Sequence, residues 1–247
     1  MIKKILNFIP YNLKNSLYDF FIYLFFNKQY MSRKNYRFSD ENLKFIHLME
    51  CVNYLRVAGF EKEIPSVIFE FGCHSGRTFS SMINSSKYLK LNDAMFYAFD
   101  SFEGLPETNQ KVDGFFQTGT FSTSLTKFKQ IVKSRTGLKL SNDQCIKGYY
   151  EDTLNSNLQN KLPKVGLVHI DVDLYSSTVT VLDFIKPLLV VGSIIVFDDW
   201  YCFPPGKPLG ERLAFEEFKS KNEGFDFEPW KSYSTFGKSF FVTKIPD

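Results

Sequence analysis

The chain of 247 residues has few cysteines and little net charge. Its four cysteines, Cys51, Cys73, Cys145 and Cys202, form no CxxC pair, which argues against a disulfide framework and a zinc site. We therefore expect a reducing, cytoplasmic compartment. A net charge of +3 is too small for a nucleic-acid footprint, so we expect no nucleic-acid partner. The most apolar run, residues 17–26, is too short to span a bilayer and contains Asp19.

The positive charge is concentrated near the N-terminus, where residues 1–37 contain seven Lys or Arg and one acidic residue, a net charge of +6. Apolar residues at three- and four-residue steps predict an amphipathic helix over 1–30, bent or restarted at Pro10. Such a helix can contact a membrane surface, cover a site as a lid or pack as a dimer arm. A second helix is predicted from Ser39 to Gly59, so that residues 1–58 form a helical extension and 59–247 the main domain.

A glycine-containing turn follows the first predicted strand, which ends at Glu70 and Phe71. Gly72 and Gly76 precede a helix predicted from about Arg77, and their spacing is ExGxxxG. This is neither GxGxxG nor a Gly-Lys-Ser/Thr loop, which argues against dinucleotides and nucleoside triphosphates. The glycines either let the backbone approach a ligand or only reverse the strand into the helix.

The next two strands also end in polar residues. The second ends at Asp100, which is placed to bind a ribose diol or to cap the following turn. The third ends near Lys147 and Gly148, and is followed by Tyr149 and Tyr150. These rings can stack on an adenine or pack in the core, and the sequence leaves both open.

Residues 166–200 read as strand, helix and strand, and each strand runs into two aspartates: Asp171 and Asp173, then Asp198 and Asp199. Parallel strands end at the same edge of a sheet, so we expect the four carboxylates to lie close together, with Asp171 and Asp173 on one face if the strand stays regular. Without a cation they would repel one another. Oxygen-only ligands favour Mg²⁺ or Mn²⁺. His169 shares the face of Asp171 and is either a catalytic participant or a hydrogen-bonded core residue.

The pattern as a whole is α/β. A helix is predicted near Leu125, with Ser122 or Ser124 as its cap, and another over 210–221. Two final strands with Gly237 near their bend complete about seven strands. We predict a Rossmann-like, seven-stranded, mostly parallel sheet with a terminal antiparallel strand pair and the helical N-terminal extension.

Several of these motifs occur together in one order: "FEFGCHSGRTF", "FDSFEGLPE", "KGYYEDTL", "HIDVDLYSST" and "DDWY". The glycine turn, the acidic tip at Asp100 and the final strand pair resemble the class I S-adenosylmethionine-dependent methyltransferase fold, and the ordered motifs resemble the macrocin O-methyltransferase family. The resemblance covers about residues 60–220. One departure is His74-Ser75, where the family often has a tryptophan and a basic residue.

The resemblance implies roles for individual residues. It assigns Asp171, Asp198 and Asp199 to a metal, Mg²⁺ or Mn²⁺, and Asp173 to the general base. Apart from the resemblance, the strand face that His169 shares with Asp171 makes it a second catalytic candidate. The resemblance places the methionine end of S-adenosylmethionine at Glu70, Gly72 and Gly76, the ribose at Asp100 and the adenine near Tyr149. With their neighbours, the candidate cofactor-binding residues are Glu70, Gly72, Cys73, Ser75, Gly76, Asp100, Ser101, Gly148, Tyr149 and Asp171.

The function that the resemblance implies is magnesium-dependent O-methylation of a hydroxyl on a sugar or on a glycosylated or nucleotide-linked small molecule. Two alternatives remain open: a non-sugar diol or phosphorylated metabolite as acceptor, and a catalytically silent subunit that docks through its N-terminus. We expect the acceptor pocket to be formed by residues 1–58, 105–124 and 201–212, and a homo-oligomer is compatible with the N-terminal arm.

Overall fold

The computed structural model describes residues 33–204, 206 and 208–246. The chain divides into two compact units, Met1–Leu43 and Lys44–Asp247. The amphipathic helix predicted over residues 1–30 lies outside the described residues. Within the described part of the chain, no helix has an apolar stretch sufficient to cross a membrane.

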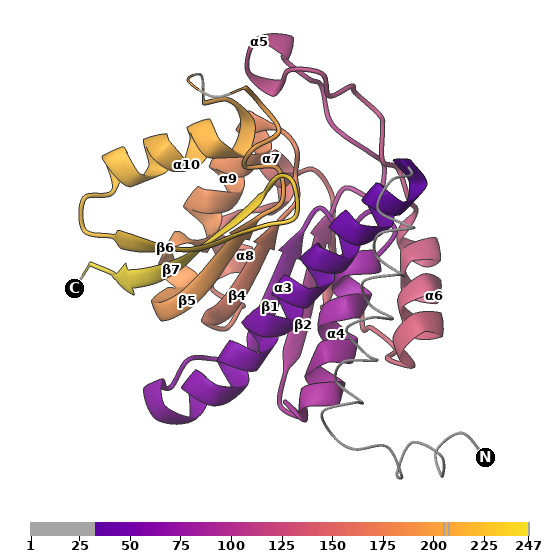
Figure 1. Ribbon diagram of the computed structural model, residues 1–247, viewed down its shortest axis with the longest axis vertical. Helices are drawn as coiled ribbons and strands as arrows, with labels where there is room; N and C mark the ends of the chain where they lie inside the picture. Colours follow the sequence, from indigo (N-terminus) through magenta and orange to yellow (C-terminus); the bar gives the residue numbers. More distant parts are fainter. Residues whose placement is uncertain (1–32, 205, 207, 247) are drawn as a thin grey trace, which may run out of the picture. The chain divides into compact units, whose positions relative to one another are not determined.

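The second unit is built on one seven-stranded sheet, as predicted, in the order β3-β2-β1-β4-β5-β7-β6 (Figure 1). β3, β2, β1, β4 and β5 pair in parallel, whereas β7 pairs antiparallel with β5 and with β6. The strands are β1 (Val67–Phe71), β2 (Met95–Asp100), β3 (Cys145–Lys147), β4 (Val165–Ile170), β5 (Leu189–Phe197), β6 (Asp226–Tyr233) and β7 (Gly237–Lys244). The chain moves outward from β1 through β2 to β3 and then returns to place β4 on the other side of β1. The carboxyl ends of β1 and β4 therefore form the point at which an open α/β sheet offers a crevice.

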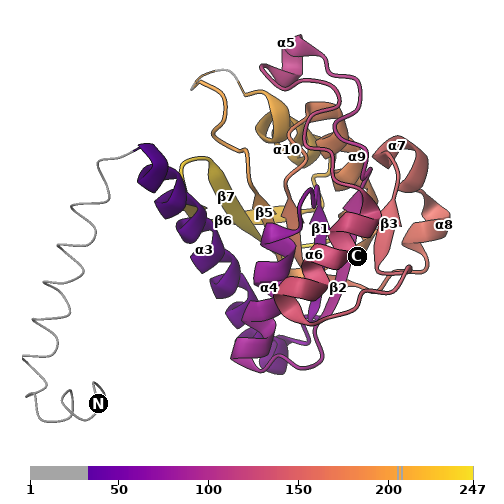
Figure 2. The ribbon, with the colours of Figure 1, turned by 90° about the vertical axis from the view of Figure 1, so that its right-hand side faces the viewer.

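Helices cover both faces of this sheet (Figure 2). The longer ones are α3 (Arg33–Lys62), α4 (Arg77–Leu89), α6 (Leu125–Thr136), α9 (Tyr175–Ile185) and α10 (Gly210–Lys221). The short ones are α5 (Gln110–Asp113), α7 (Tyr150–Thr153), α8 (Ser156–Gln159) and the 3₁₀ helix η1 (Lys186–Leu188). Ser124, one of two caps proposed for the helix near Leu125, accepts a hydrogen bond from the Lys127 N–H.

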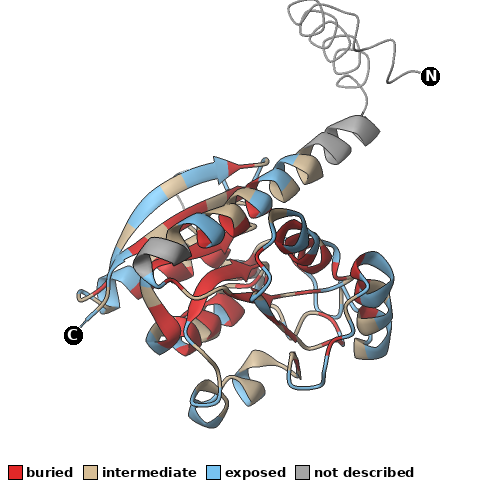
Figure 3. Ribbon diagram, turned by 90° about the horizontal axis from the view of Figure 1, so that it is seen from below, coloured by how far each residue is buried: buried red, intermediate tan, exposed pale blue. Residues whose placement is uncertain are grey.

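Two apolar cores separate the sheet from its helical layers. Residues of α3, α4 and α6, such as Leu55, Phe79 and Phe128, share one core with alternate strand residues, and residues of α9 and α10, such as Leu182 and Phe215, share the other. The central strands are buried, whereas most of β6 at the edge is exposed or half-buried (Figure 3). Because both faces of the central strands are covered, these strands read as continuous apolar runs in the sequence.

α3 differs from the prediction. It was expected to begin at Ser39 and stop at Gly59, but it is one helix that passes through both residues. A single glycine inside a helix costs only about 1 kcal/mol, which packing overrides. Leu48, Cys51, Val52 and Leu55 of α3 are fully buried in the core. This part of α3 therefore belongs to the compact unit that begins at Lys44.

Candidate functional site

Four aspartates lie where β4 and β5 end, immediately after Ile170 and Phe197. They form two overlapping groups, in each of which one ligand atom per residue lies within 4.8 Å of the others. One group is His169, Asp171 and Asp198, and the other is Asp171, Asp173 and Asp199. Asp171 is common to both groups and is therefore central to the cluster.

Asp173 joins this cluster through a turn that follows β4, and not by alternation of side chains along the strand. β4 ends at Ile170, and Asp173 has a left-handed backbone with φ of 62°. The condition that Asp171 and Asp173 share a face of a regular strand is therefore not met. The turn, rather than alternation along the strand, brings the Asp173 carboxylate beside Asp171 and Asp199. A left-handed non-glycine residue is costly and is often found at functional sites.

The electrostatics of the cluster follow from burial and like charge. Burial and the neighbouring Asp198 raise the pKa of Asp171 well above its usual value, and burial with Asp199 does the same to the pKa of Asp173. The pKa of Asp199 is raised by burial and by Asp198. A cation would relieve this repulsion, and the oxygen donors suit a hard divalent ion. The described residues thus fit a magnesium or manganese site.

Asp198 behaves differently from its neighbour Asp199. Burial by itself disfavours the charged form, but His169 and Lys44 outweigh burial and lower the pKa of Asp198 to about 2. The Lys44 ammonium forms an ion pair with Asp198 Oδ2, while the Tyr233 hydroxyl lies 3.4 Å from Oδ1. Sequence reasoning missed Lys44, because it lies on a helix 154 residues away in the chain.

A second missed residue is Glu211, at the start of α10. Its side chain is fully buried. Oε2 accepts a hydrogen bond from the Asp199 N–H at 2.9 Å, and Oε1 faces the Val172 N–H at 3.4 Å. Glu211 therefore ties together the two loops that carry the aspartates. Its sequence signal was only an acidic residue in the first turn of a helix, which is common at any helix start.

The glycine turn contacts the aspartate loop directly. A Cβ atom on Gly72 would lie 1.7 Å from the Asp171 carbonyl oxygen, and the φ of Gly72 is +81°. Gly76 has φ of +66°, and a Cβ there would lie 2.9 Å from the Phe128 ring. Packing therefore requires glycine at both positions. At Gly72 it also lets the ends of β1 and β4 meet.

Asp100 joins the same turn to the end of β2. Its Oδ2 accepts hydrogen bonds from the N–H groups of Cys73, at 2.7 Å, and His74, at 2.8 Å. Its Oδ1 accepts from the Phe102 N–H at 2.6 Å. The turn-capping role considered for Asp100 is thus present. The carboxylate also fixes the position of the glycine turn against β2.

The remaining candidates near the turn have mainly backbone or core contacts. The Ser101 hydroxyl donates to the Gly104 carbonyl at 2.8 Å, and the Ser75 carbonyl accepts from Arg135 at 3.3 Å. Cys73 is buried, and its thiol faces the Glu70 carbonyl at 3.4 Å.

Glu70 and His169 form a buried pair beneath the turn. They lie opposite each other on β1 and β4, and Glu70 Oε1 is 3.0 Å from His169 Nδ1. Both side chains are completely buried. Within the described part of the chain, Glu70 Oε2 and His169 Nε2 have no hydrogen-bond partner. His169 Nε2 is 3.9 Å from Asp198 Oδ1, too far for a hydrogen bond but close enough for attraction.

The two tyrosines after β3 have different environments. Tyr150 packs against one of the cores and donates a hydrogen bond to the Phe99 carbonyl at 3.1 Å, as expected of a core tyrosine. Tyr149 is half-buried at the N-terminus of α7. It follows Gly148, whose N–H donates to the Asp100 carbonyl. Of the two rings, Tyr149 is the one not committed to the core.

Two loops expected to border an acceptor contact each other above the strand ends. A Cβ on Gly114 would lie 2.3 Å from the Phe203 ring, and one on Gly210 would lie 2.6 Å from that ring and 3.5 Å from the Asp173 carbonyl. Phe115, which is 66% exposed, lies 6.1 Å from Phe203 between ring centroids. Asp113 anchors the first loop by accepting from the Tyr175 N–H at 2.9 Å. An aromatic wall thus adjoins the aspartate loop.

Comparisons with known proteins identify the family and the fold of the chain. A family model described as macrocin-O-methyltransferase (TylF) matches residues 42–224. No curated protein sequence matches the chain. The structure is similar to that of the O-methyltransferase NovP, with a TM-score of 0.62, 19% identity and coverage of 81% of this chain and 79% of NovP.

Two further solved structures show the same fold. The calicheamicin methyltransferase CalS11 has a TM-score of 0.64 and 19% identity, with coverage of 97% of this chain and 89% of CalS11. TomG from Streptomyces achromogenes, an O-methyltransferase solved in complex with SAM, has a TM-score of 0.51 and 11% identity, covering 80% of this chain and 79% of its own.

Proposed function

We propose that this chain, which belongs to the macrocin O-methyltransferase family and is a methyltransferase, takes its methyl group from S-adenosylmethionine. The methyl group would be transferred to a hydroxyl of a sugar or a sugar-linked small molecule with the help of Mg²⁺. The observation that carries this proposal is the cluster of four aspartates at the sheet's crevice, three of which have a raised pKa. Such a cluster is costly unless a cation occupies it.

The aspartates divide into two roles. Asp171, with Asp198 and Asp199 on either side, would hold the cation, and each lies within 4.8 Å of Asp171 through one oxygen. A bound divalent cation supplies Lewis acidity, which makes a coordinated hydroxyl easier to deprotonate. Glu211 keeps the Asp199 and Val172 backbones in place, so that the ligands are oriented before binding.

Asp173 is the proposed general base. Its carboxylate lies beside Asp199 and Asp171, so it would adjoin a hydroxyl positioned at the cation. Burial raises its pKa, which makes its carboxylate a stronger base than an exposed aspartate. Asp173 would accept the hydroxyl proton on its carboxylate oxygen as the hydroxyl oxygen bonds to the methyl carbon, and the methyl–sulfur bond would break to leave S-adenosylhomocysteine.

The cofactor is proposed to lie along the ends of β1, β2 and β3. S-adenosylmethionine supplies the activated methyl group, and TomG is an O-methyltransferase solved with it. On this chain, the turn from Gly72 to Gly76 would face the methionine end, Asp100 the ribose and Tyr149 the adenine. Asp100 already uses its oxygens for three backbone amides, so its main contribution is to hold the turn in position.

A sugar acceptor is supported by one structural relative and by the loops over the aspartates. A second structure of CalS11 is described as that of a TDP-rhamnose 3'-O-methyltransferase. Here Phe115 and Phe203 provide an aromatic wall next to Asp173. Aromatic faces pack well against apolar ring faces, while the carboxylates and a cation can bind hydroxyls.

Titration calorimetry with the full chain tests the proposal. S-adenosylhomocysteine and Mg²⁺ are titrated separately and then together, and we expect binding of both. Asp198→Asn should weaken Mg²⁺ binding and leave S-adenosylhomocysteine binding unchanged. If neither ligand binds the native chain, the proposed function is wrong.

A further inference from the structure

One positively charged side chain enters the aspartate cluster from α3. We propose that Lys44 is an internal counter-ion that competes with the divalent cation for Asp198 and thereby sets the cation affinity of the site. This inference rests on the proposed function, because it concerns the same cation site. It assigns to α3 a direct role at the strand ends, in addition to its packing on the sheet.

The position of Lys44 on α3 explains how it reaches the cluster. Lys44 is one turn before Leu48, and the spacing from 44 through 48, 51 and 55 follows the buried stripe of the helix. Leu48, Cys51 and Leu55 hold this stripe against the sheet with no exposed surface. The ammonium is therefore aimed at the end of β5, and its side chain retains only 19% exposure.

Asp198 is the partner over which the lysine and the cation would compete. Its Oδ2 is paired with the Lys44 ammonium, and its side chain is 11% exposed. Its Oδ1 faces the Tyr233 hydroxyl at 3.4 Å and His169 Nε2 at 3.9 Å. Both oxygens thus face donors in the described structure. A divalent ion that binds Asp198 must displace or share the ammonium.

The charge balance gives the expected direction. The Lys44 ammonium compensates negative charge at Asp198, one of the four clustered aspartates. Lys44 therefore weakens binding of a divalent ion in two ways: it reduces the negative charge that attracts the ion, and its ammonium repels the ion directly. Replacing Lys44 with a neutral side chain of similar length removes both penalties. The cation should then bind more tightly, and the ion-free protein should lose a favourable contact.

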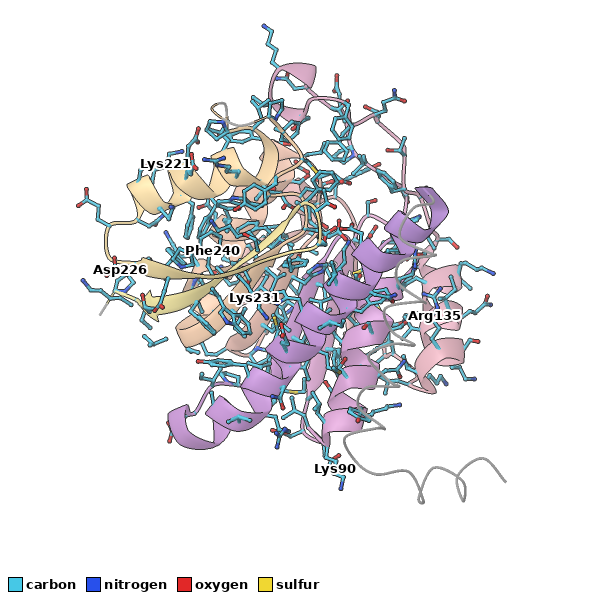
Figure 4. All side chains as sticks on the ribbon, viewed as in Figure 1. Lys90, Arg135, Lys221, Asp226, Lys231 and Phe240 are labelled. Carbon is cyan, nitrogen blue, oxygen red and sulfur yellow. The ribbon has the colours of Figure 1, made fainter. Side chains whose placement is uncertain are left out.

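Electron paramagnetic resonance of free Mn²⁺ measures this affinity without an acceptor or turnover. We expect Lys44→Met to tighten Mn²⁺ binding by about tenfold or more, equivalent to about 1.4 kcal/mol. Lys44→Arg, which keeps the charge, should bind Mn²⁺ much as the native chain does. The matched control is Lys231→Met, because Lys231 on β6 pairs with Glu50 at 2.7 Å, in an exposed ion pair (Lys231 is labelled in Figure 4).

Two further variants, Asp198→Asn alone and Asp198→Asn combined with Lys44→Met, test whether the effect of Lys44 on cation binding passes through Asp198. If the lysine acts by competing for Asp198, the tightening caused by Lys44→Met should be smaller in the Asp198→Asn background. Circular dichroism with and without Mg²⁺ checks that each variant folds. If Lys44→Met is unfolded without metal, the comparison of Lys44→Arg with Lys44→Gln replaces it, with the tighter binding expected for Gln.

The outcomes separate the two proposals. If the native chain binds no Mn²⁺, the proposed cation site is wrong. If it binds Mn²⁺ but neutral variants of Lys44 bind it no more tightly than the native chain, Lys44 is not a competing counter-ion and the proposed function is unaffected.

Discussion

The negative charge of the carboxylates is compensated differently on the two sides of the crevice. On the β1 and β2 side, one carboxylate, Asp100, is met by three backbone N–H groups of the chain itself. On the β4 and β5 side, four aspartates cluster and Lys44 pairs with only one of them, Asp198. On the first side the folded chain itself supplies the hydrogen-bond donors, whereas the second requires a cation for full compensation. The comparison distinguishes an acid that the backbone stabilises from acids that a bound cation would stabilise.

Gly72→Ala should produce the largest effect, because it forces apart the two sides where they touch. A methyl group would lie 1.7 Å from the Asp171 carbonyl oxygen on a residue with positive φ. We expect a loss of more than about 4 kcal/mol of unfolding free energy, or failure to fold. Urea unfolding measures this. Gly119→Ala is the control, since Gly119 has φ of +78° with no atom within 4 Å of an added Cβ, and should cost only about 1 kcal/mol. Equal losses for the two variants would contradict the close-contact explanation.

Asp173→Asn should abolish the proposed chemistry and leave the glycine-turn side intact. The amide cannot accept the hydroxyl proton, so we expect kcat to fall by about 10²–10⁴. Calorimetry should show unchanged affinity for S-adenosylhomocysteine. The rate is measured as methyl transfer to whichever sugar acceptor proves active. An Asp173→Asn variant with native turnover would show that another group is the base.

Glu211→Gln tests whether the cluster depends on its supporting residue. The amide keeps one acceptor oxygen but places an N–H₂ group where one backbone N–H is now bound. We expect Mn²⁺ affinity to fall by about 10- to 100-fold, as for other residues that orient metal ligands. Glu216→Gln on the same helix is the control, because Glu216 pairs with Arg212 in a half-exposed ion pair. A Glu211→Gln variant that binds Mn²⁺ normally would remove Glu211 from the site.

The stability of the metal-free chain should depend on pH in a direction set by the aspartates. Asp171, Asp173 and Asp199 have a pKa raised above 3.8, so the stability that they contribute is present at low pH and lost as the pH rises through their folded-state values. Asp198 acts in the opposite direction. Its pKa is lowered from 3.8 to about 2, so the stability that it contributes is present above pH 3.8 and is lost as the pH falls toward 2.

Melting temperatures at pH 5 and pH 8, with EDTA or with Mg²⁺, measure this dependence. We expect Mg²⁺ to raise the melting temperature by a few degrees more at pH 8 than at pH 5, since ionised aspartates bind it better. An equal increase at both values would argue against cation binding by these aspartates.

Much of the fold followed from local patterns. The apolar runs identified the buried parallel strands, because both faces of such strands are covered. Two runs with Gly237 near their bend identified the β6–β7 pair. The ends of α3 could not be predicted in this way. Ser39 and Gly59 are ordinary helix-boundary signals, but the core contacts of Leu48, Val52 and Leu55 favour continuing the helix.

The sequence alone determined that four aspartates follow two neighbouring strands, and topology then required those strand ends to lie at one edge of the sheet. Only the tertiary structure decided how the four differ. Lys44 and His169 lower the pKa of Asp198, burial raises the pKa of Asp199, and a left-handed turn aims Asp173. The reason is physical: the charge state of a buried acid depends on groups within a few ångströms, and here those groups come from α3, β4 and α10, far apart along the chain.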